Sequence, residues 1–204
     1  MINQHRTNFK DYKEFFKDCE SFKAEKQNYH LSYKEFIKYF ENIFENKNLI
    51  GKHHLIIGIN FTYGWMPTIL DFRSENFDEA IEILNKAKKE GNLEIEDLNI
   101  LMHLFNNSLV GTSKLLHFIN PEKFAIWDSR VCRYLTGNNN PTPKQLKPKY
   151  YLQFLNYITN LTQKEEYDTI HDSICAKLNL DYSMTKLRSA ELVMYSKGSK
   201  IVNQ

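Results

Sequence analysis

Hydrophobic side chains recur every three or four residues along most of the chain, which is the period of helices that bury one face. Glycine and proline, which usually separate strands, occur only 7 and 5 times. The predicted fold class is therefore all-α, with about eight to ten helices. The apolar run 55–59 has the length of a strand, but a buried helix fits a chain with this periodicity better. The clearest helical patterns cover residues 9–22, 32–44, 76–91, 98–105, 131–137, 148–158, 162–178 and 187–194.

Residues typical of helix ends support these boundaries. Ser32, Asn76 and Thr162 are each followed three positions later by Glu, which is the pattern of a capping box at a helix start. Gly91 and Gly137 stand where two apolar patterns stop, as expected of glycine at helix C-termini. We expect the whole chain, 1–204, to form a single all-helical unit that can be divided into two lobes.

Composition places the chain among globular proteins. Of its 204 residues, 42% are hydrophobic and 14% aromatic, which is enough for a core and excludes a disordered or fibrous protein. Residues 1–20 are charged throughout and no apolar run approaches the ~18 residues of a membrane helix, so we expect neither a signal peptide nor a membrane span. Cys19, Cys132 and Cys175 are odd in number and far apart, which indicates reduced thiols in a cytoplasmic protein.

The chain lacks the sequence motifs of several kinds of functional site. It contains neither a phosphate-binding glycine loop nor the G-x-S-x-G elbow of hydrolases. The histidines lack the spacing of metal ligands, and His53 and His54, being adjacent, point in different directions on a helix. We therefore expect no metal and no cofactor. A net charge of +2 permits nucleic-acid binding through a local basic patch without requiring it.

The most informative part of the chain is the segment 108–135. It is interpreted as the end of one helix, a tight turn at Val110, Gly111 and Thr112, a second helix, a proline-containing loop, and Asp128 as the N-cap of a third helix. A hairpin of this kind turns backbone N–H groups outward at a helix start, where a phosphate can be held. The sequence thus predicts a helix-hairpin-helix and Asp-bearing segment over 95–137.

This segment resembles the helix-hairpin-helix superfamily of base-excision DNA glycosylases (HhH-GPD-like), as a divergent member. The family's hairpin follows the pattern L-P-G-V-G-x-[KS]-x-A, and its catalytic Asp lies in a pattern close to F-P-[IV]-x-D-x-x-V-x-R-[IVL]. The sequence K-F-A-I-W-D-S-R-V-C-R-Y-L at 123–135 matches the second pattern well. In the hairpin, Val110 and Gly111 fit, whereas Ser108 and Leu109 stand in place of Pro and Gly.

The resemblance implies an enzyme that flips a base out of DNA and breaks its N-glycosidic bond. Asp128 would stabilise the positive charge of an oxocarbenium-like transition state or activate the attacking water. Bifunctional members carry a nucleophilic Lys two residues after the second hairpin Gly, where this chain has Ser113. The resemblance therefore implies a monofunctional glycosylase, with Lys114, one residue further on, as the alternative nucleophile. The interval from Ser113 to Asp128 is shorter than the family usually has.

The resemblance also implies a base pocket and a DNA-binding surface. Tyr63, Trp65 and Trp127 are the candidate walls of the pocket, because aromatic rings can stack on a flipped base. The four-cysteine iron–sulfur set of some members is absent. The candidate contacts to duplex DNA, through its backbone phosphates, are Val110, Gly111, Thr112, Ser113, Lys114 and Arg130.

Each of these assignments has a structural alternative. Asp is a common N-cap, so Asp128 could serve only to start its helix. Large aromatic residues such as Trp127 belong to the core more often than to a pocket, and His117 is expected to be a packed core histidine. The alternative function is a non-catalytic helix-hairpin-helix module that binds DNA or a protein. A third alternative is a helical protein with no nucleic-acid role.

Overall fold

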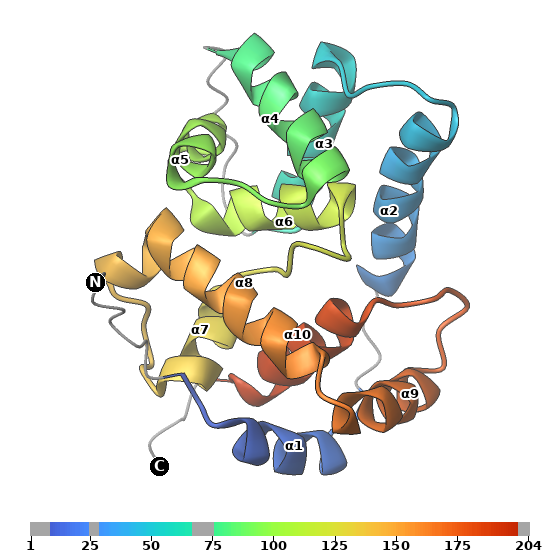
Figure 1. Ribbon diagram of the computed structural model, residues 1–204, viewed down its shortest axis with the longest axis vertical. Coiled ribbons are helices and arrows are strands. Elements are labelled where there is room, and N and C mark those ends of the chain that lie inside the picture. The colour runs from blue at the N-terminus through green and yellow to red at the C-terminus, as the bar shows by residue number, and fades with distance from the viewer. Residues whose placement is uncertain (1–8, 25–28, 67–75, 200–204) are drawn as a thin grey trace.

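The computed structural model describes residues 9–24, 29–66 and 76–199, and every regular element within these segments is a helix, which confirms the all-α prediction (Figure 1). None of the helices in these segments is both long and apolar enough to cross a lipid bilayer. The elements are α1 (Tyr12–Glu20), α2 (Tyr29–Glu45), α3 (Lys52–Gly64), α4 (Phe77–Glu90), α5 (Ile95–Leu104), α6 (Leu109–Ile119), α7 (Ser129–Thr136), the short 3-10 helix η1 (Pro143–Leu146), α8 (Pro148–Thr162), α9 (Glu166–Leu178) and α10 (Lys186–Lys197).

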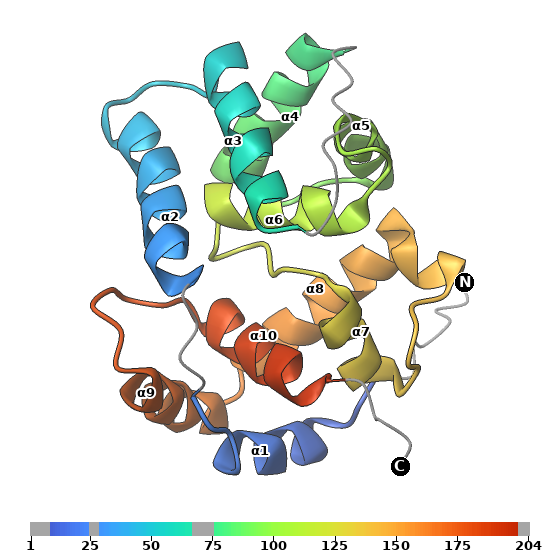
Figure 2. The same ribbon diagram turned by 180° about the vertical axis from the view of Figure 1, so that it is seen from behind.

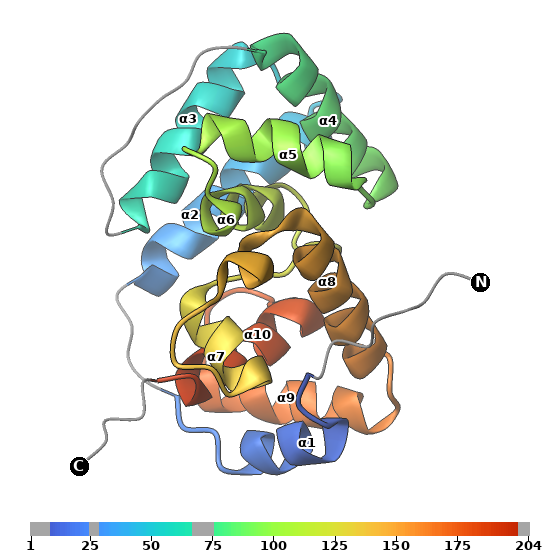
Figure 3. The same ribbon diagram turned by 90° about the vertical axis from the view of Figure 1, so that its left-hand side faces the viewer.

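The helices are arranged in two groups, one above the other in Figure 1. Helices α2 to α6 form the first group, in which α6 contacts α2, α3, α4 and α5. Helices α1 and α7 to α10 form the second group, in which α10 contacts α1, α7, α8 and α9. The views from behind and from the side show the same division, with residues 120–128 passing from one group to the other (Figure 2 and Figure 3).

The central helix of each group is buried on almost every side. In α6, all residues from Gly111 to Ile119 are buried, and in α10 the same holds from Leu187 to Met194. A helix buried on all sides is normally apolar throughout. However, α6 carries Lys114, and α10 carries Arg188 and Glu191. Because buried charges are costly unless they are paired, these three side chains mark where the interior departs from a simple apolar core.

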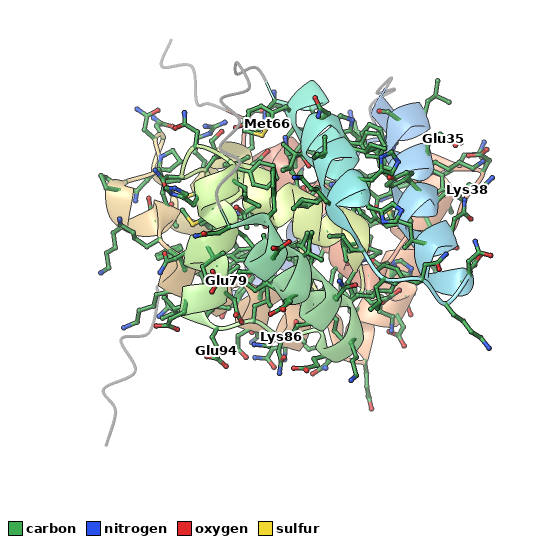
Figure 4. All side chains as sticks on the ribbon, turned by 90° about the horizontal axis from the view of Figure 1, so that it is seen from above. Glu35, Lys38, Met66, Glu79, Lys86 and Glu94 are labelled. Carbon is green, nitrogen blue, oxygen red and sulfur yellow. The ribbon has the colours of Figure 1, made fainter. Side chains whose placement is uncertain are left out.

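The outer helices have the amphipathic pattern that the sequence predicts. Glu35 and Lys38 point away from α2, and Glu79 lies on the outer side of α4 (Figure 4). The opposite face of α4 is buried through residues such as Leu84. The charged groups therefore stay in water while the apolar faces pack inward.

Several predicted helices and helix ends are confirmed. The apolar run 55–59 is helical and lies in α3. Asp128 is the N-cap of α7. Gly91 and Gly137 end α4 and α7 with φ angles of 70° and 71°, in the left-handed region that glycine adopts without a steric penalty.

None of the three predicted capping boxes forms, and two of the three residues do not start a helix. Helix α2 begins at Tyr29, so Ser32 lies inside the helix, where its hydroxyl accepts a hydrogen bond from the Trp65 indole N–H at 2.9 Å. Thr162 is the last residue of α8 and does not start α9. Asn76 is the N-cap of α4 as predicted, but its side chain makes no capping hydrogen bond. Polar side chains inside a helix can bond to neighbouring groups, so the sequence pattern alone does not fix a helix start.

The predicted tight turn around Gly111 is also wrong, because Gly111 lies in the first turn of α6. The chain turns earlier, at Asn106 and Asn107, whose φ angles of 53° and 59° lie in the left-handed region that Asn tolerates. Ser108 is the N-cap of α6, and its hydroxyl accepts the Gly111 N–H at 3.2 Å. Gly111 is required by packing: a Cβ at this position would lie 2.7 Å from Cδ1 of Phe105.

We expect Gly111→Ala to destabilise the protein by about 1–3 kcal/mol, the usual cost of overpacking a filled core. In an open part of a helix the same change would stabilise by up to about 1 kcal/mol, so the sign of the effect reports the contact with Phe105. Gly64→Ala is the matched control, because a Cβ at Gly64 has no atom within 4 Å. Urea denaturation of both variants tests the prediction. A Gly111→Ala protein as stable as the wild type would contradict the close contact.

Candidate functional site

A cavity of about 430 Å³ lies between the two groups of helices. Its walls come from the end of α3, from α6, from the segment that leads into α7, and from α10. This volume is within the range of sites that bind small ligands. The lining residues are Gly64, Trp65, Met66, Lys114, Ile126, Asp128, Arg188, Glu191, Leu192 and Tyr195.

Lys114 brings an amine from the buried face of α6 to this cavity. The residue is 9% exposed, and its Nζ donates a hydrogen bond to the backbone carbonyl of Trp65 at 2.8 Å. Burial lowers the pKa of Lys114, while the carboxylates of Asp128 and Glu191 act in the opposite direction. The amine is therefore easier to deprotonate than a solvent-exposed lysine, which is what a nucleophilic lysine requires.

Asp128 brings a carboxylate to the same cavity from the start of α7. Its Oδ1 accepts the backbone N–H groups of Arg130 at 2.8 Å and Val131 at 2.9 Å. These are capping bonds, so the structural role that the sequence allows for Asp128 is present. The carboxylate also lines the cavity. Asp128 therefore combines a helix cap with a position at the candidate site.

Two residues that are not among the predicted site residues complete the charged lining. Arg188 and Glu191 form an ion pair on α10, and their exposed fractions are 4% and 1%. The guanidinium of Arg188 also lies 4.9 Å from the ring centroid of Tyr33. Burial raises the pKa of Glu191 to about 7, although the neighbouring Arg188 opposes this. In the sequence, the pair has the same spacing as an exposed ion pair on a helix surface, so no sequence signal identifies it as buried.

Ser113 and Trp127 link the two halves of the site. The hydroxyl of Ser113 accepts the backbone N–H of Trp127 at 3.0 Å, and both residues are fully buried. The Trp127 indole donates to the carbonyl of Gln145 at 3.1 Å, and its ring packs 4.8 Å from that of Phe154. Trp127 is therefore a core residue that does not line the cavity, which corrects its assignment to a base pocket. Its polar N–H has an internal partner, so the ring can be buried completely.

The other two aromatic candidates are separated by the fold. Tyr63 is buried and stacks on Phe105, with ring centroids 5.9 Å apart, and it is not among the lining residues of the cavity. Trp65 does line the cavity, and its ring stacks on that of Tyr33 at 5.9 Å. Of the three predicted pocket walls, the structure thus brings Trp65 to the site. The aromatic-rich segment 61–67, a candidate pocket wall in the sequence, ends at Pro67, which lies outside the described residues.

The candidate DNA contacts are also divided by burial. The side chains of Thr112 and Ser113 face the interior, and the Thr112 hydroxyl donates to the Ser108 carbonyl at 3.1 Å. Gly111 is buried as well, so these three residues present no side-chain surface to DNA. Val110 is half-buried. DNA binding through the accessible part of this hairpin stays a prediction.

Arg130, the remaining candidate DNA contact, is half-buried beside the cavity. Its guanidinium lies 4.5 Å from the ring centroid of Tyr195, a lining residue. Contact of Arg130 with a phosphate also stays a prediction.

His117 is a buried core histidine, as the sequence predicts. Burial lowers its pKa to about 3, so the ring is neutral near pH 7. Its Nδ1 lies 2.7 Å from the carbonyl oxygen of Phe124, which can only accept, so this nitrogen carries the proton. Its Nε2 must then accept the hydroxyl proton of Tyr33 at 2.8 Å. This chain of hydrogen bonds fixes the Tyr33 ring, which in turn contacts both Arg188 and Trp65.

The lining groups favour acid–base or nucleophilic chemistry. In the described segments, no group of three His, Cys, Asp or Glu side chains is placed to hold a metal ion. Comparison of the chain with models of known protein families, with curated proteins and with solved structures found no match. The functional interpretation of the cavity therefore depends on its own residues.

We expect Glu191→Gln to change how stability depends on pH. Between pH 4.5 and about 7, folded Glu191 holds a proton that the unfolded chain releases, so this group lowers the free energy of unfolding as the pH rises through that window. The effect reaches about 1.4 kcal/mol per pH unit for one proton. Glu191→Gln lacks this contribution, so its stability relative to the wild type should increase between pH 4.5 and 7.

Chemical denaturation at several pH values measures this difference, and comparison of the two proteins cancels the contribution of the other titrating groups. Glu79→Gln, a change of the same kind on the exposed face of α4, is the control and should show no such trend. A constant difference between wild type and Glu191→Gln across the window would contradict the protonation of buried Glu191.

Proposed function

We propose that this chain is a DNA glycosylase-like protein that binds DNA and breaks the N-glycosidic bond of a base flipped into the cavity. The observation that carries the proposal is that the Asp128 carboxylate and the Lys114 amine line the same cavity. The segment 123–135, which carries Asp128, is the one that resembles helix-hairpin-helix glycosylases. The alternative in which Asp128 is only a helix cap does not account for an amine buried beside it at some cost in stability.

The arrangement of the helices agrees with this proposal. Helix α5, the turn at Asn106 and Asn107, and α6 would form the helix-hairpin-helix element. The two groups of helices would be the two lobes of a glycosylase-like fold, with the substrate base in the cavity between them. The hairpin differs from that of the family because its glycine serves packing, as described for Gly111.

Asp128 would act on the sugar. When the C1′–N bond breaks, the bonding electron pair leaves with the base, and the sugar gains the positive charge of an oxocarbenium ion. A nearby carboxylate stabilises that charge and can accept a proton from the water that attacks C1′. The departing base takes up one proton, so the products are the free base and an abasic site.

Lys114 supports a second, covalent route at the same site. Family spacing places the nucleophile at Ser113, but the Ser113 hydroxyl is held by the Trp127 backbone in the interior. The Lys114 amine lines the cavity instead, and burial lowers its pKa. Its nitrogen would attack C1′ while the base leaves with the bonding pair. Opening of the sugar ring and loss of a proton would then give a Schiff base.

A non-catalytic helix-hairpin-helix module is the alternative function. The altered hairpin and the short interval from Ser113 to Asp128 favour it, because both depart from the pattern of the glycosylase family. Such a module would bind DNA or a protein, would release no base, and would be insensitive to substitution of Asp128.

We expect Asp128→Asn to reduce base release at least about a hundredfold, because a neutral amide cannot stabilise the developing positive charge. Asn caps helices as well as Asp does, so the fold should survive. Base release is measured on duplexes that carry damaged or mismatched bases, and binding on a duplex with an abasic-site analogue should be unchanged or tighter. Asp11→Asn is the matched control, since Asp11 caps α1 through the Lys13 N–H in the same way. Wild-type rates in Asp128→Asn would show that the catalytic assignment is wrong.

The covalent route through Lys114 predicts that borohydride traps a covalent adduct between the wild-type protein and a duplex with an abasic site. The abasic sugar presents an aldehyde, so this experiment does not require knowledge of the substrate base. Lys114→Met should form no adduct, whereas Lys86→Met, at an ion pair with Asp97 on the outer surface, should react like the wild type (Figure 4). Failure of the wild type to form an adduct would exclude the covalent route and leave the hydrolytic one.

A further inference from the structure

The candidate cavity is lined by two carboxyl groups, each of which has one oxygen engaged by the protein. Oδ1 of Asp128 accepts two backbone N–H groups at the start of α7. Oε2 of Glu191 accepts a hydrogen bond from the guanidinium of Arg188 on the same helix, α10. The other two oxygens, Oδ2 of Asp128 and Oε1 of Glu191, accept no hydrogen bond from any of the described residues. Each carboxyl group therefore keeps one oxygen for a ligand.

Both of these oxygens are open to the cavity. A polar atom that is buried without a partner is costly, and within the described segments Tyr39 Oη on α2 is the buried side-chain atom in that state. Oδ2 of Asp128 and Oε1 of Glu191 are not in that state, so each has surface that a ligand can reach. Because Glu191 is 1% exposed and lines the cavity, the part of it that stays accessible faces the cavity. A ligand there can thus contact two carboxyl oxygens that come from different helices.

The two carboxyl groups have different surroundings. Asp128 lies at the N-terminus of α7, where backbone N–H groups bind the ionised form of a carboxyl group. Glu191 lies in the middle of α10, the buried central helix of its group. Burial raises the pKa of Glu191 to about 7 against the opposing effect of Arg188, and the negative charge of Asp128 acts in the same direction as burial. Two carboxyl groups whose surroundings separate their protonation states are the usual arrangement of a general base and a general acid.

We infer that Glu191 is a second catalytic residue, which donates from Oε1 the proton that the departing base takes up. The inference rests on the proposed function, because it completes the acid–base chemistry of the same cavity. A base leaves more easily as a neutral molecule than as an anion, so a proton donor beside the base complements a carboxylate beside the sugar. Arg188 cannot supply this proton, because a guanidinium is not deprotonated in proteins.

The reaction with Glu191 as the acid balances in protons and electrons. The C1′–N bond breaks and its electron pair leaves with the base, while the proton on Glu191 Oε1 transfers to a ring nitrogen or carbonyl oxygen of the base. Asp128 stabilises the oxocarbenium ion and accepts one proton from the water that attacks C1′. The products are the neutral base, an abasic site, ionised Glu191 and protonated Asp128. Loss of one proton from Asp128 to solvent and uptake of one by Glu191 restore the starting state.

Release of bases that need a proton, compared with bases that do not, tests this role in the full chain. Uracil, hypoxanthine and 8-oxoguanine leave DNA as anions unless they are protonated. N7-methylguanine and N3-methyladenine are cations in the nucleotide, so they leave as neutral bases without a proton. We expect the wild type to release at least one base of the first kind from a duplex, and Glu191→Gln to reduce that rate at least about a hundredfold.

Two comparisons show that this loss is specific to proton donation. Any release of N7-methylguanine or N3-methyladenine should be as fast in Glu191→Gln as in the wild type, whereas a general disturbance of the cavity would slow release of both kinds of base. Glu79→Gln, on the exposed face of α4, is the matched control and should behave like the wild type with every duplex (Figure 4).

The pH profile of base release separates proton donation from a structural role. Because the donor must hold its proton, the wild-type rate should fall by about tenfold per pH unit above about 7. Glu191→Gln should lack this decline, and Glu191→Asp, which keeps a carboxyl group on a shorter side chain, should be slower than the wild type but retain a decline. The titratable and charged groups that face Glu191 are Arg188, Asp128, Lys114, Tyr33 and Tyr195. A decline that persists in Glu191→Gln belongs to one of them and would overturn the inference.

Failure of this inference is distinguishable from failure of the proposed function. Release of cationic bases alone, or release of an uncharged base by Glu191→Gln at the wild-type rate, overturns the role of Glu191 and leaves the glycosylase function standing. A wild-type protein that releases no base from any of these duplexes overturns the function, and the inference with it.

Discussion

The hydrogen bond between the Trp127 N–H and the Ser113 hydroxyl sets the geometry of the candidate site. Ser113 is next in sequence to Lys114, and Trp127 is next to Asp128, so one contact of 3.0 Å fixes the amine and the carboxylate relative to each other. The contact is held on one side by the buried helix α6 and on the other by the packing of Trp127 against Phe154. It also joins the first group of helices to the segment that leads into the second, and the cavity lies beside that junction.

The interior around this contact is more polar than stability requires. Buried ion pairs such as Arg188–Glu191 often stabilise a protein no more than apolar residues of similar size would, because the cost of removing both charges from water offsets their attraction. The pair is embedded in further contacts, since Arg188 rests on the Tyr33 ring and Tyr33 donates its hydroxyl proton to His117. Breaking any one of these contacts disturbs the others, which couples the geometry of the cavity to the packing of α2, α6 and α10.

The sequence predicts the elements of this fold better than it predicts their contacts. Helix periodicity identifies most helices, and the Asp128 cap and the Gly137 stop follow from local backbone chemistry. The sequence pattern around Gly111 predicts a turn, because a sequence cannot distinguish a glycine required by its φ angle from one required by a neighbouring ring. The burial of Trp127, and of Arg188 with Glu191, depends on how distant helices pack, and no local pattern records that packing. Of the residues that line the candidate cavity, the sequence analysis names Asp128, Lys114 and Trp65. The charged lining on α10 is visible only in the structure.

Two of the buried titratable groups at the centre of the fold have opposite effects on proton uptake. The pKa of His117 on α6 is lowered from 6.5 to about 3. Between these pH values the unfolded chain binds a proton that the folded protein does not, so a fall in pH lowers the free energy of unfolding. Glu191 on α10 has its pKa raised from 4.5 to about 7, so acid favours the folded protein. Between pH 4.5 and 6.5 the two proton linkages oppose each other at nearly equal slope. In weakly acidic surroundings the contribution of His117 on α6 to the pH dependence of stability is thus offset by that of Glu191 on α10, and below pH 4.5 Glu191 no longer offsets the loss of stability caused by His117.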